Sequence, residues 1–229
     1  MNNKNPFVGK IALSYDKFFE SDYGKKIFNL EKELLINFLK KLSISSLLEI
    51  GCGTGIWLKV FEKELNIKVF GIDISLDMLK VAKEKGLKNL ILGDAKNLPF
   101  KNNLFDITMF ITSLEFIENK PKALYEAMRV SKKYLGVAYL NLFSLLSLER
   151  KIKTFFKNSV YKSASFLSFG KVKNILEAEA RKLGKNLKLL KRGSTLNLVT
   201  TKYINLKLEK LIGYNSPFGA FEFLIFEIN

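Results

Sequence analysis

The stretch LLEIGCGTG, Leu47 to Gly55, is the strongest local signal in this chain. An apolar run ends in three glycines, Gly51, Gly53 and Gly55, and a helical pattern begins directly after them. Glycine lets the backbone turn sharply and approach a ligand without a clash from a Cβ. A loop between a strand end and a helix start presents free N–H groups, which favour a carboxylate or a phosphate. The stretch therefore predicts a ligand-binding turn of an open α/β sheet.

Short apolar runs alternate with helical patterns around this turn, which predicts a doubly wound sheet with parallel strands and right-handed crossovers. Ser75, Pro121 and Gly86 stand where an N-cap, an early helical proline and a C-terminal stop are expected. The expected strands are Leu47–Gly51, Lys68–Asp73, Asn89–Gly93, Phe105–Ile111, Tyr134–Leu142, Leu187–Lys191 and Gly219–Ile228. The expected helices are Ile27–Leu42, Ile56–Leu65, Ser75–Lys85, Lys120–Ser131, Ser144–Lys157, Lys171–Leu183 and Ile204–Leu211.

The spacing of the glycines separates two families of nucleotide-binding turn. A dinucleotide fingerprint counted from Gly51 requires glycine at position 56, which is Ile56. The GxGxG spacing instead resembles motif I of the class I S-adenosylmethionine-dependent methyltransferases, with Glu49 at their acidic position before the glycines. The resemblance implies a Rossmann-like, mostly parallel seven-stranded sheet with an antiparallel last strand and helices on both faces. It implies S-adenosylmethionine as the cofactor.

Two aspartates follow in the order that this resemblance implies. Asp73 ends the second expected strand, and an ionised carboxylate there offers two acceptor oxygens to the ribose hydroxyls. Asp94 ends the third, where similar enzymes hold the adenine amino group with an acidic side chain and the ring with a neighbouring backbone N–H. Each aspartate could instead only cap the turn that follows it. The resemblance places further cofactor contacts at Cys52, Ile74, Met78 and Ala95.

The segment FDITMFITSLEFIEN, Phe105 to Asn119, resembles the fourth-strand segment of the same family. Ile111, Thr112, Ser113 and Leu114 would line the methyl-donor end of the cofactor, and Glu115 would face that wall or the acceptor. Core packing is the alternative for Leu114, Phe116 and Ile117, and it is favoured for Phe116. The resemblance covers about residues 46–142 and is to small-molecule methyltransferases of the type that includes ubiquinone and menaquinone biosynthesis enzymes.

The segment Ser14 to Leu35 resembles a stretch that precedes motif I in these enzymes. By that resemblance Tyr15 and Phe19 would fold over the cofactor as a lid, although packing alone could explain both aromatic side chains. A lid has a physical purpose, because transfer of a methyl group benefits from a dry, aligned site. The expected organisation is one domain, 1–229, with a helical lid (1–45), a cofactor-binding core (46–142), a substrate-side insertion (143–170) and C-terminal helices and strands (171–229).

The absence of histidine and the presence of a single cysteine, Cys52, limit the chemistry. A zinc site of Cys and His ligands is excluded, and no metal is expected. A separate cysteine nucleophile is absent too, which disfavours C5 methylation of pyrimidines. If an acceptor needs a general base, the candidates are Glu115, Tyr15 and Asp16.

The net charge of +16 is uneven, with 16 Lys and Arg against 4 Asp and Glu in residues 149–210. This excess could be a solvated lysine-rich surface, or it could hold RNA or an anionic membrane surface. The favoured acceptor is a small, partly apolar molecule, enclosed by Ser144–Lys157 and Ser163–Gly170. An RNA methyltransferase and a non-catalytic nucleoside-binding regulator are the alternatives. The sequence has no apolar run long enough for a membrane span and no secretory signal pattern, so a cytoplasmic location is expected; the oligomeric state stays open.

Overall fold

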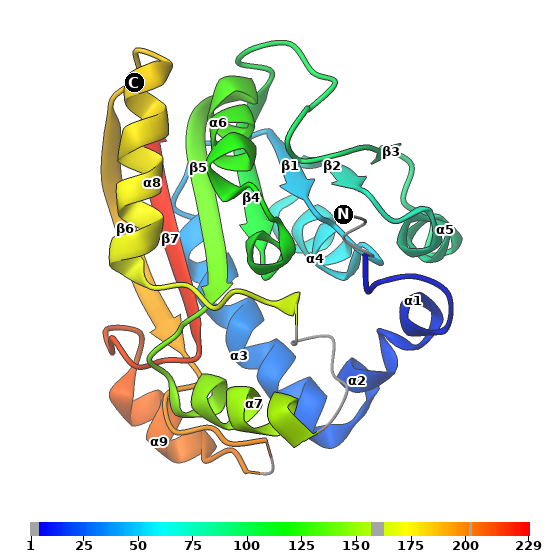
Figure 1. The fold of residues 1–229 in the computed structure, drawn as a ribbon, viewed down its shortest axis with the longest axis vertical. Helices are drawn as coiled ribbons and strands as arrows, with labels where there is room; N and C mark the ends of the chain where they lie inside the picture. Colours follow the sequence, from blue (N-terminus) through cyan, green and yellow to red (C-terminus); the bar gives the residue numbers. More distant parts are fainter. Residues whose placement is uncertain (1–4, 157–162, 202) are drawn as a thin grey trace.

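The computed structural model describes residues 5–156, 163–201 and 203–229, which form a seven-stranded sheet between two layers of helices (Figure 1). The strands are β1 (Ser46–Ile50), β2 (Lys68–Asp73), β3 (Leu90–Leu92), β4 (Phe105–Ile111), β5 (Ser131–Leu140), β6 (Leu187–Thr195) and β7 (Phe221–Ile228). The helices are α1 (Lys10–Ser14), α2 (Lys17–Glu20), α3 (Asp22–Leu39), α4 (Ile56–Leu65), α5 (Leu76–Glu84), the 3-10 helix η1 (Leu114–Phe116), α6 (Lys120–Val130), α7 (Leu145–Phe156), α8 (Phe169–Lys182) and α9 (Leu206–Ile212).

The strands are ordered β3-β2-β1-β4-β5-β7-β6 across the sheet. The pairs β1–β2, β2–β3, β1–β4 and β4–β5 are parallel, and β7 is antiparallel to both of its neighbours. This confirms the expected mostly parallel sheet with an antiparallel last strand. The chain leaves β1 toward β2 on one side and returns to β4 on the other, so the sheet has its switch point beside β1. In such sheets a ligand crevice lies outside the carboxyl ends of the strands at that point.

Two hydrophobic cores hold the layers together, one on each face of the sheet. Side chains alternate between the faces, so Leu47 packs against α3 and α4 while its neighbour Leu48 packs on the face that α6 and α8 cover. Both leucines are fully buried, as are Leu34 of α3 and Leu124 of α6. Figure 1 shows α6 and α8 in front of the sheet and α3 behind it. A central parallel sheet buried on both faces needs apolar side chains at consecutive positions, which the sequence supplies.

The ends of several elements differ from their expected positions. β6 extends to Thr195 instead of Lys191, because its antiparallel pairing with β7 continues through the polar residues of that segment. β5 begins at Ser131, three residues early, and α3 begins at Asp22, where Ser21 accepts a hydrogen bond from the N–H of Gly24. The caps at Ser75, Pro121 and Gly86 are confirmed. The expected helix 144–157 is α7, and its last residue lies outside the described part of the chain.

No helix in the described ranges combines the length and the apolar character that a bilayer span requires.

Candidate active site

The glycine loop turns the chain from β1 into α4 and is fixed by backbone hydrogen bonds. The N–H of Gly51 donates to the carbonyl oxygen of Ile72 (2.8 Å), and the N–H of Gly55 donates to that of Cys52 (2.9 Å). The φ angles of Gly51, Gly53 and Gly55 are 75°, 53° and 71°. L side chains rarely adopt these angles, so the alternating glycines follow from the backbone path.

The three glycines have different neighbours. A Cβ on Gly51 would lie 2.5 Å from the Cβ of Ser113, and one on Gly55 would lie 2.2 Å from the Cδ1 of Leu87. A Cβ on Gly53 would meet only the Sδ of Met78, at 3.9 Å. Packing against Ser113 therefore excludes a side chain at Gly51, and a side chain at Gly55 would require the buried Leu87 to move, whereas Gly53 borders open space among the described residues.

That space is a cavity of about 390 Å³ at the carboxyl ends of β1, β2 and β4. Most of the residues expected from the sequence to bind cofactor line it, whereas Phe19 and Gly55 do not. Their individual contacts with a cofactor stay a prediction. Those that line the cavity are Tyr15, Glu49, Gly51, Cys52, Gly53, Asp73, Ile74, Met78, Asp94, Ala95, Ile111, Thr112 and Ser113.

Asp73 joins the two neighbouring turns of the site. Its Oδ2 accepts from the N–H of Gly53 and its Oδ1 from the N–H of Ser75, both at 2.8 Å. Burial raises the pKa of this carboxyl above its ordinary value, and the backbone hydrogen bonds offset part of the rise. Asp73 thus holds the glycine loop in place at the wall of the cavity.

Asp94 lies on the next turn along the sheet edge, after β3. Its Oδ1 accepts from the N–H of Lys96 (2.9 Å), and its Oδ2 lies 3.5 Å from the Nζ of the same residue. The side chain is 40% exposed. Asp94 therefore stabilises its own turn, as the capping alternative expects, and also borders the cavity.

Glu49 carries a buried acceptor atom beside the glycine loop. Its Oε2 has no hydrogen-bond partner within the described ranges, and the residue is 1% exposed. Burial, followed by the charge of Asp73, holds the pKa of the Glu49 carboxyl well above its usual range. An unsatisfied buried acceptor is costly. A bound cationic donor would relieve that cost, and the amino-acid part of S-adenosylmethionine ends in an ammonium group, so this residue fits that cofactor.

The chain after β4 forms a wall of the cavity beside the glycine loop. Thr112 has a φ of 47°, which is unusual for a β-branched residue and typical of functional sites. Ser113 is fixed by a hydrogen bond from its Oγ to the carbonyl oxygen of Ile50 (2.6 Å). Leu114, also expected in this wall, is buried in the core instead. Phe116, assigned to the core from the sequence, is half-buried and lines the cavity.

Residues near the N-terminus close one side of the cavity. Asn5, Pro6, Phe7 and Tyr15 line it. The Phe7 ring contacts the Phe116 ring edge to face, with 4.8 Å between centroids, and the Ser75 Oγ donates to the carbonyl oxygen of Phe7 (2.5 Å). Sequence reasoning missed Phe7, because it lies before the segment that carries the resemblance.

Phe19 belongs to the lid without reaching the cavity. Its ring packs against Tyr15 and Phe28, at 5.9 and 5.6 Å between centroids. Its contribution is therefore to hold the Tyr15 ring, which agrees with the packing alternative.

Asp16, a candidate base, does not line the cavity. Its Oδ1 accepts from the Oγ1 of Thr54 in the glycine loop (2.7 Å), and its Oδ2 forms an ion pair with Lys85. The Nζ of Lys85 also donates to the carbonyl oxygen of Thr54 (2.9 Å). These contacts join the lid, the glycine loop and the end of α5, so we refer to Asp16, Thr54 and Lys85 as the latch.

Replacing Asp16 by alanine is expected to raise the KM for S-adenosylmethionine about three- to tenfold, because a partly exposed charged contact contributes about 1 kcal/mol. The rate at saturating cofactor should change less. Initial-rate kinetics measure both, and Glu20→Ala, an exposed lid residue, is the control. A loss of kcat at saturating cofactor with an unchanged KM would contradict a latch role and favour a base.

Glu115, another candidate base, also lies outside the cavity wall. It is 1% exposed, and its Oε1 accepts from the N–H of Leu140 (2.5 Å). Burial raises the pKa of its carboxyl from 4.5 to about 7, although the Leu140 hydrogen bond acts in the opposite direction. Its carboxyl therefore takes up a proton at a pH where an exposed glutamate would be ionised.

Between pH 4.5 and about 7 the folded protein binds a proton at Glu115 that the unfolded chain releases, so this residue lowers stability as pH rises through that window. Glutamine does not titrate, so the Glu115→Gln variant lacks this pH dependence. The difference in free energy of unfolding between the variant and wild type should therefore shift in favour of the variant by about 1 to 3 kcal/mol from pH 5 to pH 8. Urea unfolding at both pH values measures this. The exposed Glu177→Gln variant should show no such gain, and equal behaviour of the two variants would refute the assignment.

The expected substrate-side insertion contributes little to the described wall. Ser163 lines the cavity, and the N–H of Ser165 donates to the carbonyl oxygen of Glu115 (2.9 Å). Leu167 is fully buried and forms a bridge with Asn141. No residue of α7 whose side chain is described (145–150 and 152) lines the cavity, and residues 157–162 of this segment lie outside the described part of the chain. The enclosure of an acceptor by α7 therefore stays a prediction.

Comparison with known proteins gives matches along this chain. A family model described as a methyltransferase domain matches residues 48–134. An uncharacterized protein of Methanocaldococcus jannaschii is 38% identical over 172 residues, which are 73% of this chain and 77% of that protein. Malonyl-(acyl-carrier protein) O-methyltransferase of Buchnera aphidicola is 30% identical over 168 residues, which are 72% of this chain and 64% of that enzyme.

A solved structure gives a match over most of the chain. It is a crystal structure of an S-adenosylmethionine-dependent methyltransferase, described as a possible histamine N-methyltransferase, from Thermotoga maritima. The TM-score is 0.69 at 25% identity, and the match covers 95% of this chain and 96% of that one. The matched family region, 48–134, contains the glycine loop, both aspartates and the wall after β4.

Proposed function

This chain belongs to the class I S-adenosylmethionine-dependent methyltransferases, and from that premise we propose that its cavity binds the cofactor between the glycine loop, Asp73 and Asp94. The observation that carries the proposal is that three carboxylates border one cavity, and that a buried oxygen of one of them, Glu49, has no hydrogen-bond partner in the described part of the chain. Asp73 would accept from the ribose hydroxyls, Asp94 from the adenine amino group, and Glu49 from the ammonium group.

S-adenosylmethionine supplies an electrophilic methyl group on a sulfonium. The residues of this chain hold it and exclude water, and the wall after β4 with Tyr15 and Phe7 orients the acceptor. Alignment of this kind can contribute about 7 to 11 kcal/mol to the lowering of a barrier. Asp16 and Glu115 are engaged elsewhere, so Tyr15 is the one candidate base of the three that borders the cavity.

The acceptor is a small, partly apolar molecule. Phe7, Phe116 and Ile117 give one part of the cavity an apolar lining, which suits such a molecule better than a charged nucleic acid strand. Within the described ranges Ser163 is the one residue of 149–210 that lines the cavity. Several cations of that basic region are engaged within the protein, Arg192 with Glu222 and Lys182 with Glu179. These contacts favour a small acceptor over RNA.

Transfer of a labelled methyl group into fractions of a source-cell extract tests this proposal. We expect label in small molecules that partition into organic solvent, and none with the Asp73→Asn variant. Label in RNA, with binding that falls steeply as salt rises, would overturn the small-acceptor assignment. Flotation of the protein with anionic vesicles would separately reveal binding of the protein to a membrane surface.

A further inference from the structure

The loop from Gly93 to Leu104 connects β3 to β4 without regular secondary structure, and its first part is a wall of the cavity. Gly93, Asp94, Ala95 and Lys96 line the cavity. The N–H of Gly93 donates to the carbonyl oxygen of Asp73 (3.0 Å), which ties the start of the loop to the end of β2, and the local contacts of Asp94 fix its own turn. Beyond that tie, the placement of Asp94 and Ala95 also depends on what holds the rest of the loop.

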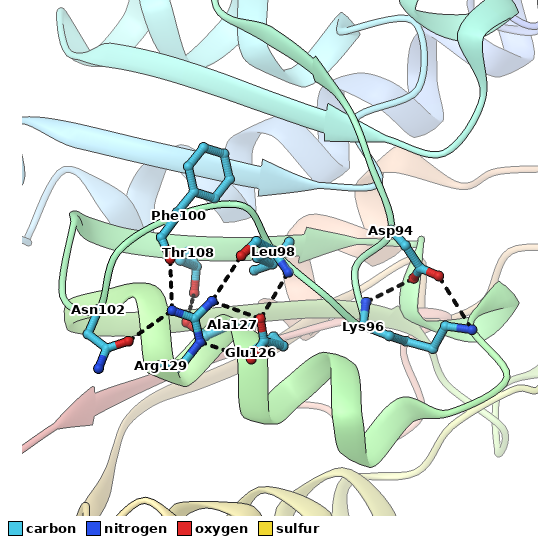
Figure 2. A network of polar contacts seen from close by, with 9 residues as sticks. All are labelled: Asp94, Lys96, Leu98, Phe100, Asn102, Thr108, Glu126, Ala127 and Arg129. Carbon is cyan, nitrogen blue, oxygen red and sulfur yellow. Dashed lines mark hydrogen bonds and ion pairs between the residues drawn. The ribbon is translucent and has the colours of Figure 1, made fainter.

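Arg129, in the last turn of α6, holds the second half of the loop (Figure 2). Its Nη1 donates to the carbonyl oxygen of Phe100 and to the Oδ1 of Asn102, both at 2.8 Å. Its Nη2 donates to the carbonyl oxygen of Leu98 (2.9 Å). One guanidinium thus binds three successive points of an irregular loop.

Glu126, one helical turn earlier, completes the arrangement. Its two oxygens accept from the Nε and Nη2 of Arg129, at 2.9 and 2.8 Å, and Oε2 also accepts from the N–H of Leu98 (2.9 Å). All five guanidinium N–H donors of Arg129 are thereby used. Lysine offers three donors from a single atom, so it cannot reproduce this planar set.

The salt bridge between Arg129 and Glu126 is largely shielded from solvent, which strengthens it. The Arg129 and Glu126 side chains are 19% and 6% exposed. Burial disfavours the charged form of Glu126, but the hydrogen bonds from Arg129 and from the N–H of Leu98 outweigh it and keep the pKa of this carboxyl below its ordinary value. α6 itself is tied to β4, since the Oγ1 of Thr108 donates to the carbonyl oxygen of Ala127 (3.2 Å). The loop is thus anchored through Glu126 and Arg129 to the centre of the sheet.

We infer that Arg129 and Glu126 are positioning residues that set the selectivity of the site for adenine, by fixing the wall formed by Asp94 and Ala95. The inference rests on the proposed binding of S-adenosylmethionine in this cavity. Neither side chain lines the cavity, so both act through the loop. An Asp94 carboxylate held at a fixed place accepts from an amino group and repels a carbonyl oxygen in the same position. A loop that moves freely loses this discrimination.

The test compares two ligands by titration calorimetry, S-adenosylhomocysteine and S-inosylhomocysteine, whose base carries an oxygen in place of the adenine amino group. Wild type is expected to prefer the adenine ligand by about tenfold or more, the value of one charge-assisted hydrogen bond. Arg129→Gln is expected to reduce this preference to about threefold or less, mainly by weakening the adenine ligand. Arg129→Lys keeps a charge beside Glu126, so this variant is expected to fold even if the glutamine variant does not, and its preference for the adenine ligand should fall as well.

Arg192→Gln is the matched control. Arg192 also forms a half-exposed pair with a buried glutamate, since its Nε donates to Glu222 (2.6 Å), but on β6, away from the cavity. This variant should lose thermal stability and keep the wild-type preference. A wild-type preference in Arg129→Lys, or an equal loss in Arg192→Gln, would overturn the inference while leaving the proposed function standing. Failure of wild type to bind S-adenosylhomocysteine would overturn both.

Discussion

Asp73→Asn is expected to weaken the binding of S-adenosylhomocysteine at least about a hundredfold, because two hydrogen bonds to a charged group contribute about 3 to 6 kcal/mol. The carboxylate has two tasks. It accepts from the N–H groups of Gly53 and Ser75, and it would accept from the ribose hydroxyls. Asparagine keeps one acceptor oxygen and turns an amide donor toward a backbone donor. Titration calorimetry of the purified variant measures the loss.

Asp106→Asn is the matched control for this variant. Asp106 also ties two segments together, since its Oδ2 accepts from the N–H and the Oγ of Ser45 at 2.8 and 2.6 Å, but it lies at the start of β4 and does not line the cavity. The Asp106→Asn variant should have a lower free energy of unfolding than wild type and the same affinity for S-adenosylhomocysteine. Equal affinities in the two variants would show that Asp73 acts on the fold alone.

Gly51→Ala is expected to lower the free energy of unfolding by at least about 2 kcal/mol and to abolish measurable cofactor binding. A φ of 75° strains any L residue, and the new Cβ would lie 2.5 Å from that of Ser113. Ser113 cannot move aside freely, because its Oγ is bonded to the carbonyl oxygen of Ile50. Urea unfolding and calorimetry with S-adenosylhomocysteine measure the two effects.

The clash and the strain can be separated. The double variant Gly51→Ala, Ser113→Gly removes the neighbour and should recover part of the lost stability, whereas the strain remains. Gly170→Ala, in α8 with open space around it, should be neutral or slightly stabilising. No recovery in the double variant would mean that the contact with Ser113 is not what excludes a side chain at position 51.

The core of the fold could be predicted because its signals are local. The glycines after β1 and the caps at Ser75 and Pro121 mark where strands end and helices begin. The alternation of strand and helix patterns along the chain predicts that the strands run parallel. The ends of β5 and β6 could not be predicted. Their polar residues join the sheet through pairing with neighbouring strands, which is a tertiary effect that overrides local preference.

Site residues could be predicted where the residue type and its position at a strand end together point to one role. Gly51 and Asp73 lie at strand ends, and both border the cavity. Phe7 and Phe116 could not be assigned, since an aromatic residue in sequence looks the same in a core and in a wall. Asp16 was a candidate base by its chemistry alone, and Glu115 by its chemistry and by the resemblance that placed it facing the wall after β4 or the acceptor. The structure places the first in an ion pair and the second against the backbone of β5, partners that lie far away in sequence.

A crystal structure of the chain with S-adenosylhomocysteine bound would show whether Asp73, Asp94 and Glu49 hold the ligand as proposed. We expect the ribose on Asp73, the adenine beside Asp94 and Ala95, and the amino-acid part beside Glu49, within the cavity that Tyr15 closes. Ligand bound elsewhere, or bound in this cavity with its ribose away from Asp73, would contradict the proposal.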